Sequence, residues 1–179
     1  MTIETLAKQG RVRVYTGLAG IDTVRLKTMR NSSLKACFHR LEETRYRLEF
    51  VARVYGREYI NDAASRSVNA TWYSLESVTG GIIWIADAPL RDVDYGRLLS
   101  PALRKVRMLL ILGGESECLR RSFGGIIPVI EACPSMAYAL QRAYRYEADD
   151  VKVIYSPACD DGVSKEEKGE RFRQEVNEL

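Results

Sequence analysis

The sequence is poor in histidine, and this scarcity limits the chemistry available to it. His39 is the single histidine among 179 residues. Catalysis that needs a second histidine is therefore ruled out, and so is a histidine-rich metal site. In the stretch "LKACFHRLEE", His39 falls in a helical pattern, which favours an ordinary surface or packing role.

Long apolar runs and paired cysteines are also lacking. No stretch approaches the roughly 18 apolar residues that span a bilayer, and "MTIETLAKQGRVRVY" does not resemble a signal peptide. We therefore expect a soluble, cytoplasmic protein with no membrane partner. The four cysteines form no C-x-x-C pair, so we expect buried free thiols, with no zinc site and no disulfide framework. They are Cys37, Cys118, Cys133 and Cys159.

A strong excess of one charge is absent as well. Lys and Arg number 27 against 24 Asp and Glu, which gives a net charge of +3. This balance argues against nucleic acid as a partner. A local basic patch could be formed by Arg40, Arg45, Arg47 and Arg53. The more ordinary interpretation is that these residues lie on a solvated helix face and strand edge.

What the sequence does contain, from residue 46 onward, is an alternation of strand and helix patterns. Two short strands flank Tyr55-Gly56 and predict a hairpin. Ser67, Ser135 and Ser164 are candidate N-caps, the last with Glu167 three residues on. Strands are predicted over 48–54, 57–61, 81–88, 107–114, 125–132 and 150–158, and helices over 67–78, 94–106, 115–123, 135–148 and 164–179.

This order predicts an α/β fold with a mostly parallel sheet covered on both faces and an antiparallel hairpin at its edge. Residues 46–179 are expected to form this domain. Residues 1–45 resemble two helices without a strand of their own, and they are too short for a separate core.

Ligands of such folds lie beyond the carboxyl ends of the strands, which here are near Asp62, Asp87, Gly113 and Ser156. "LGGES" at 112–116 could hold an anion at a helix N-terminus or be a tight turn without a ligand. Loop aspartates could bind Mg²⁺ together with phosphate, although such residues more often only form turns. These aspartates are Asp87, Asp92, Asp94, Asp160 and Asp161. The chain has no G-x-x-x-x-G-K-[ST] sequence, and hence no P-loop.

Several segments, taken in order, resemble the C-terminal domain of the Mur ligases: "RLEFVARVYGREYIND…SVNATWYSLE", "WIAD…DYGRLL", "LLILGG", "SMAYALQRAY", "DVKVIYSPAC" and "KGERFRQEV". Residues 1–45 resemble the end of that family's central domain. The resemblance implies a Rossmann-like three-layer sandwich over 46–179. It also implies descent from ATP-dependent enzymes that join an amino acid to a nucleotide-linked carboxylate, with the P-loop and Mg²⁺ ligands in the central domain.

The loops depart from the family's pattern. Tyr46 stands where the family has His, while Arg47 is kept. In the family's Asp-Ser-Lys-Ala-Thr-Asn, Asp62 is kept, but Ala64 and Arg66 replace the Lys and the Thr. The family's Gly-Gly-x-Asp-Lys-Gly becomes residues 87–92, which places Asp87 at the first glycine and Arg91 at about the lysine.

The family's substrate loop after "SPAC" is shortened to "DDGVSKEEK". The resemblance thus implies residual binding residues Arg47, Asp62, Arg91 and Ser156 around a pocket altered at Tyr46, Ala64 and Arg66, with no catalytic residue and no metal ligand.

These departures predict a protein without ligase activity of its own, without a cofactor, and with a protein partner or a second copy of itself as its ligand. Two alternatives stay open. One is a ligase subunit that needs a separate ATP-binding chain to supply ATP and Mg²⁺. The other is a sensor of small anions that uses the arginines of the altered pocket.

Overall fold

The computed structural model describes residues 45–113 and 117–179, and Tyr46–Leu179 form one compact unit. The two helices predicted within residues 1–45, together with His39, lie outside the described residues, and only Arg45 of that range is described. The "LGGES" turn is described only up to Gly113. No helix in the described part is long and apolar enough to cross a membrane.

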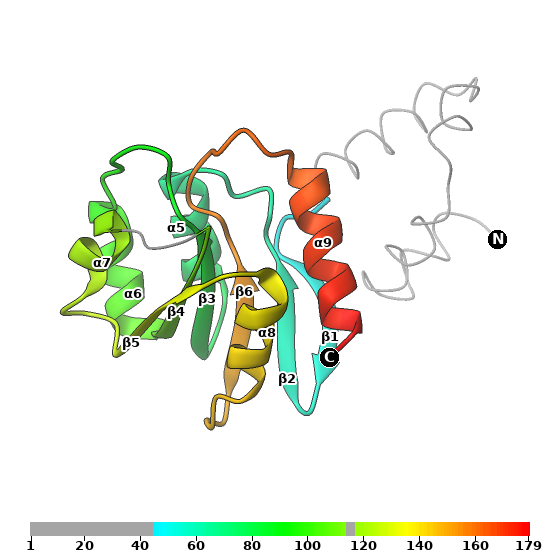
Figure 1. Cartoon of the computed structure of the whole chain (residues 1–179). Coiled ribbons are helices and arrows are strands. Elements are labelled where there is room, and N and C mark those ends of the chain that lie inside the picture. Colours follow the sequence, from blue (N-terminus) through cyan, green and yellow to red (C-terminus); the bar gives the residue numbers. More distant parts are fainter. Residues whose placement is uncertain (1–44, 114–116) are drawn as a thin grey trace, which may run out of the picture. The chain divides into compact units, whose positions relative to one another are not determined.

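Strands and helices alternate along the described chain (Figure 1). The strands are β1 (Glu49–Val54), β2 (Arg57–Asn61), β3 (Gly81–Asp87), β4 (Val106–Leu112), β5 (Val129–Cys133) and β6 (Val151–Tyr155). The α-helices are α5 (Val68–Ser77), α6 (Leu99–Lys105), α7 (Glu117–Phe123), α8 (Met136–Tyr144) and α9 (Lys165–Asn177), and a 3-10 turn, η1 (Gly96–Leu98), precedes α6.

The strands form one sheet in the order β1-β2-β6-β3-β4-β5. Among the described strands, only β1 and β2 pair antiparallel, and the other four pairs are parallel. The predicted α/β fold with an antiparallel edge hairpin is confirmed. The chain runs outward from β2 to β5 and then returns through α8 to insert β6 between β2 and β3. This reversal of direction creates the crevice at the carboxyl edge where ligands bind in such folds.

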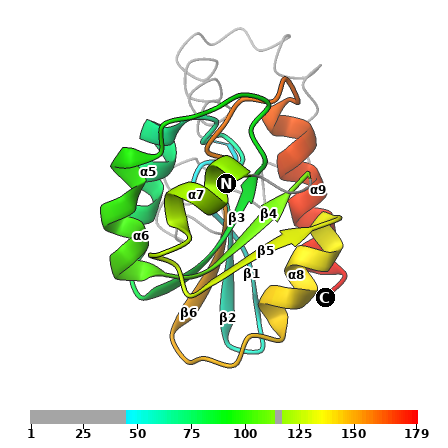
Figure 2. The ribbon, with the colours of Figure 1, turned by 60° about the vertical axis from the view of Figure 1, so that its left-hand side comes forward.

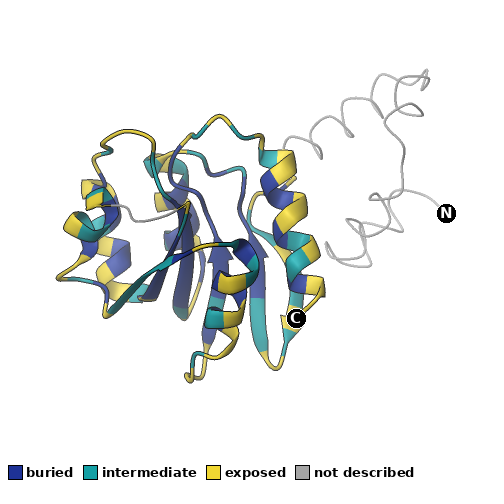
Figure 3. Cartoon of the chain, in the orientation of Figure 1, coloured by how far each residue is buried: buried dark blue, intermediate teal, exposed yellow. Residues whose placement is uncertain are grey.

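Helices cover both faces of the sheet, as Figure 2 shows. On β3, Ile83 and Ile85 pack into the core beneath α8 and α9. Ile82 and Trp84 pack into the other core, beneath α5, α6 and α7. Both faces of this strand are therefore buried, as expected for a central parallel strand (Figure 3). Each such side chain stabilises the fold by about 1.5–3 kcal/mol relative to an exposed one.

Local sequence signals fix the turns and helix starts. Tyr55 and Gly56 both have positive φ, 47° and 82°, as a two-residue type I′ hairpin turn requires. The three predicted N-caps are confirmed. The hydroxyls of Ser67, Ser135 and Ser164 accept hydrogen bonds from the backbone N–H groups of Ala70, Tyr138 and Glu167.

Some predicted boundaries differ from the structure. The helix predicted over 94–106 is instead a 3-10 turn followed by α6. Pro101 is the third residue of α6, where a backbone N–H would have no partner within the helix, so proline is tolerated there. The strand predicted over 125–132 is shifted to Val129–Cys133, because Pro128 offers no N–H to a sheet ladder. Helix α8 ends at Tyr144, four residues before the predicted end.

Candidate functional site

The carboxyl edge of the sheet brings together four segments that are distant in sequence. Asp62, Gly113 and Ser156 directly follow β2, β4 and β6, and Asp87 is the last residue of β3. Each of the four predicted positions therefore lies at the end of a parallel strand. Their side chains nevertheless face different surroundings.

Asp62 and Ser156 lie inside the protein. Both are fully buried, and Asp62 Oδ1 accepts a hydrogen bond of 3.1 Å from the Leu48 N–H. The hydroxyls of Ser156 and Thr71 are 2.9 Å apart. Burial raises the pKa of Asp62, and nearby hydroxyls, those of Ser74 and Ser65 first, limit the rise. In this conformation the two residues hold loops together and offer no surface to a ligand.

Tyr46 is a core residue. It is 1% exposed, its ring lies against Gly169, and its hydroxyl donates a 2.7 Å hydrogen bond to Glu170 Oε1. Tyr46 thus fastens the start of the domain to α9. The neighbouring Arg47 is exposed.

The two arginines of the altered loops line one hollow of about 660 Å³. Arg66 forms an ion pair with Asp160, which ties the loop after β2 to the loop after β6. Arg91 also lines this hollow and is exposed. Ala64 is half-buried and packs against the α8–α9 core. Arg66 and Arg91 therefore share a pocket, while Asp62 and Ser156 lie outside its lining.

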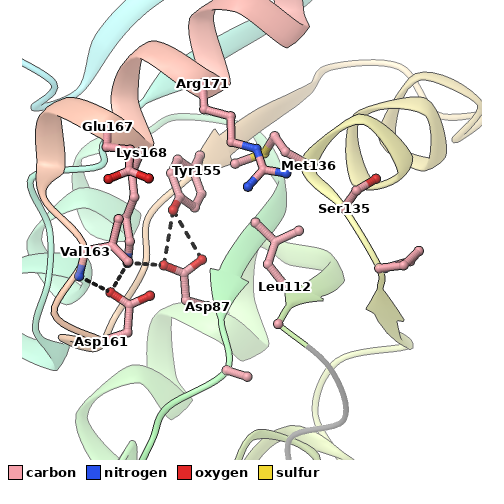
Figure 4. Close-up of a pocket in the computed structure, with 13 residues that line it drawn as sticks. Asp87, Leu112, Ser135, Met136, Tyr155, Asp161, Val163, Glu167, Lys168 and Arg171 are labelled. Carbon is pink, nitrogen blue, oxygen red and sulfur yellow. Dashed lines mark hydrogen bonds and ion pairs between the residues drawn. The ribbon is translucent and has the colours of Figure 1, made fainter.

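A second pocket, of about 280 Å³, lies between the ends of β3 and β4 and the starts of α8 and α9. Its floor is an ion-pair cluster. Lys168 Nζ lies 2.5 Å from Asp87 Oδ2 and 2.6 Å from Asp161 Oδ1. The Tyr155 hydroxyl lies 3.2 and 3.1 Å from the two carboxylate oxygens of Asp87 (Figure 4). We call Asp87, Tyr155, Asp161 and Lys168 the edge cluster.

The edge cluster is largely shielded from water. Asp87 and Lys168 are 6% and 7% exposed. Burial raises the pKa of Asp87, and the Lys168 ammonium limits the rise. Burial works to lower the pKa of Lys168, but Asp161 and Asp87 hold it above its usual value. Lys168 is therefore a charged, fully paired cation, which is unsuited to act as a nucleophile or a base.

Sequence reasoning missed Lys168 and Tyr155. A signal for Lys168 was present, because it shares a helical stripe with Phe172 and Val176 at spacings of four residues, and both of these are buried. A lysine on an apolar stripe indicates a buried cation that needs a carboxylate partner.

The loop aspartates mostly form turns. Asp94, Asp160 and Asp161 accept hydrogen bonds from the backbone N–H groups two residues later. Within the two described ranges, no group of three or more His, Cys, Asp or Glu side chains is arranged to hold a metal ion.

Comparison with known proteins gives relatives over the whole chain. No family model matches. The chain is 33% identical to UDP-N-acetylmuramoylalanine--D-glutamate ligase of Porphyromonas gingivalis, with all of the chain and 40% of that protein covered. It is also 33% identical to the ligase of the same name from Salinibacter ruber, over 40% of that protein. The corresponding Christiangramia forsetii ligase is 30% identical over 41% of its length.

The chain thus spans about two fifths of the length of the curated relatives that it matches. The sheet and its helices agree with the fold that the resemblance implies. The resemblance to the C-terminal domain of the Mur ligases is therefore confirmed, and the chain is a relative of the UDP-N-acetylmuramoylalanine--D-glutamate ligases over its whole length.

Proposed function

We propose that this Mur-ligase-type domain is non-catalytic and acts in the cytoplasm by binding a protein linked to peptidoglycan synthesis, or a second copy of itself. The observation that carries the proposal is the edge cluster. Recognition of a phosphate or a substrate carboxylate needs cations that are free to pair with it. Lys168, the buried cation of the pocket, is already paired with Asp87 and Asp161.

The altered loop after β2 supports the same conclusion. Ala64 can supply neither a cation nor a hydrogen bond where the family has a lysine. Arg66 is held by Asp160, so its charge is compensated within the chain. Asp62, which the resemblance would place against a nucleotide, is fully buried.

The binding role is supported by apolar side chains on the outer surface of two neighbouring helices. Trp72 and Tyr73 on α5 are 42% and 57% exposed, and Leu103 on α6 is 63% exposed. An Arg104–Glu76 ion pair joins the two helices. Exposed apolar side chains on adjacent helices are candidates for such a role, because exposed apolar patches mark protein-binding surfaces.

Sedimentation velocity over a range of concentrations tests self-association. We expect the weight-average sedimentation coefficient of the wild-type protein to rise with concentration, and Trp72→Ser with Leu103→Ser to abolish the rise. Tyr55→Ser, which removes an 86% exposed ring at the hairpin turn, is the control and should leave it unchanged. If the wild-type protein stays monomeric and fails to bind an intact Mur ligase in the same experiment, the binding role is wrong.

A second candidate is a ligase subunit, and it is favoured by the similarity to complete ligases. A separate chain would then supply the ATP-binding domain together with ATP and Mg²⁺. The discriminating assay is ATP-dependent phosphate release by a relative truncated to lack its C-terminal domain, with and without this chain. Turnover that depends on this chain would establish the subunit role, whereas we expect none.

A sensor of small anions is the remaining candidate, and the hollow shared by Arg66 and Arg91 favours it. In that case an anionic metabolite should raise the melting temperature of the wild-type protein, and Arg91→Ala should abolish the rise. We expect no such shift with ATP or with D-glutamate.

A further inference from the structure

The Asp87 carboxylate is held in its pocket in the way that a bound anion would be. Lys168 Nζ and the Tyr155 hydroxyl both contact it. The backbone on either side is fixed, because the Asp87 N–H donates to Pro157 O and the Ala88 N–H donates to Leu112 O. The strand therefore presents this carboxylate to a cation that belongs to a different element, α9.

The surroundings of Asp87 are suited to an anion. Tyr155 is stacked on Phe172, with ring centroids 5.6 Å apart, so its hydroxyl is held in place as a donor. Arg171 lines the same pocket, and its guanidinium group reaches across the pocket toward Met136 (Figure 4). One turn of α9 thus contributes both Lys168 and Arg171 to the pocket.

We propose that this pocket is a masked binding site for a small carboxylate or phosphate anion, formed by Lys168, Tyr155 and Arg171, and that the side chain of Asp87 closes it from within. This proposal rests on the proposed non-catalytic function, and it assigns to Asp87 the role of keeping anions out of the pocket. Position 87 is also the place where the resemblance puts a glycine, which has no side chain with which to fill such a site.

Removal of the Asp87 carboxylate should open the site. Among the residues that the structure describes, Lys168 then keeps Asp161 as its carboxylate partner, and the free volume beside it joins a pocket of about 280 Å³. A carboxylate within contact distance of a partly buried cation competes with any added anion for that cation. A gain of at least about tenfold in anion affinity, equivalent to about 1.4 kcal/mol, is a conservative expectation.

The test compares the wild-type protein with Asp87→Ala and with Asp87→Asn, which keeps the volume and the hydrogen-bond acceptor and is therefore expected to fold. Acetate and inorganic phosphate are titrated by calorimetry and by thermal shift, with sodium chloride at matched ionic strength as the reference. We expect saturable binding of at least one anion by Asp87→Ala, at least about tenfold tighter than by the wild-type protein. Asp87→Asn should show a smaller gain because the amide still occupies the space.

Two further variants make the result specific. Asp87→Ala combined with Lys168→Met should lose the gain, and Glu167→Gln, which removes a charge from the pocket rim without touching Lys168, should gain nothing. The proposal is overturned if folded Asp87→Ala and Asp87→Asn bind neither anion better than the wild-type protein does, or if the gain survives without Lys168. The first of these results would leave the proposed function intact, whereas binding of D-glutamate or ATP by the wild-type protein would contradict that function alone.

Discussion

The ring of Tyr46 lies directly against Gly169 of α9. A Cβ atom added at residue 169 would lie 2.2 Å from Tyr46 Cδ1 and 2.6 Å from Cε1. Tyr46 is 1% exposed, so the ring cannot swing aside without opening the core. The glycine is thus required by close packing, in the middle of a 13-residue helix.

Gly169→Ala should therefore destabilise the domain, although alanine is the better helix former by about 1 kcal/mol. Overpacking of a core typically costs about 1–3 kcal/mol, so after the gain in helix propensity we expect a net loss of up to about 2 kcal/mol in urea unfolding. Gly125→Ala, at a site with no atom within 4 Å of the added Cβ, is the matched control and should change the free energy of unfolding little. An unchanged midpoint for Gly169→Ala would show that Tyr46 is not fixed as described.

Arg57 should be among the most important charged residues for stability. Its guanidinium group donates to the carbonyl oxygens of Ala143, Tyr144, Tyr146 and Ala148, and so it ties the β1–β2 hairpin to the end of α8. Hydrogen bonds to charged groups contribute about 1.5–3 kcal/mol, so Arg57→Ala should lower the free energy of unfolding by about 2–3 kcal/mol.

The control for Arg57 is Arg53→Ala in the same hairpin. Arg53 is 61% exposed and pairs only with Glu58 among the described residues. Its removal should cost less than about 1 kcal/mol. Equal losses for the two variants, measured by urea unfolding, would contradict the account of Arg57.

Asp62 should destabilise the folded protein when it is ionised. Burial raises its pKa, so the folded state binds a proton more readily than the unfolded state does. The stabilisation that protonated Asp62 contributes is therefore fully present at a pH below its pKa in the unfolded state. It is lost as the pH rises through its pKa in the folded state. Asp62→Asn should therefore be more stable than the wild-type protein at pH 7, and the difference should shrink toward pH 3. A difference that grows on acidification would show that Asp62 gains more from its partners than it loses by burial.

The thiols should differ in reactivity. Burial raises the pKa of Cys133 to about 11 and that of Cys159 to about 12, whereas Cys118 is half-buried. Since the thiolate is the reactive form, iodoacetamide at pH 8 should label Cys118 first and should label Cys133 and Cys159 only after unfolding. The experiment is best done with Cys37→Ser, because Cys37 lies outside the described residues. Early labelling of Cys159, read by mass spectrometry, would contradict its burial next to Asp87.

The sequence was sufficient to predict those parts of the molecule that depend on neighbouring residues. The hairpin at Tyr55-Gly56 and the cap at Ser164 follow from local turn and helix chemistry, and both are present. The alternation of strands and helices also led to the parallel sheet. Boundaries were less well predicted, because the end of α8 is set by Arg57, 86 residues away from Ala143.

The candidate site was harder to predict for the same reason. Because Asp62 follows a strand, its place at the carboxyl edge of the sheet was predicted correctly. The direction of its side chain, which points into the protein, was not. Asp87 and Lys168 are 81 residues apart, and nothing local in the sequence joins them. Lys168 could have been suspected only from its place on the apolar stripe of α9.

We expect the wild-type domain not to bind the amino acid for which its ligase relatives are named, and isothermal titration with D-glutamate is the decisive experiment. The wild-type protein is expected to give no saturable heat at any D-glutamate concentration up to the solubility of D-glutamate. A saturable isotherm with micromolar affinity would rule this expectation out, because the domain would then still bind a substrate named for its ligase relatives.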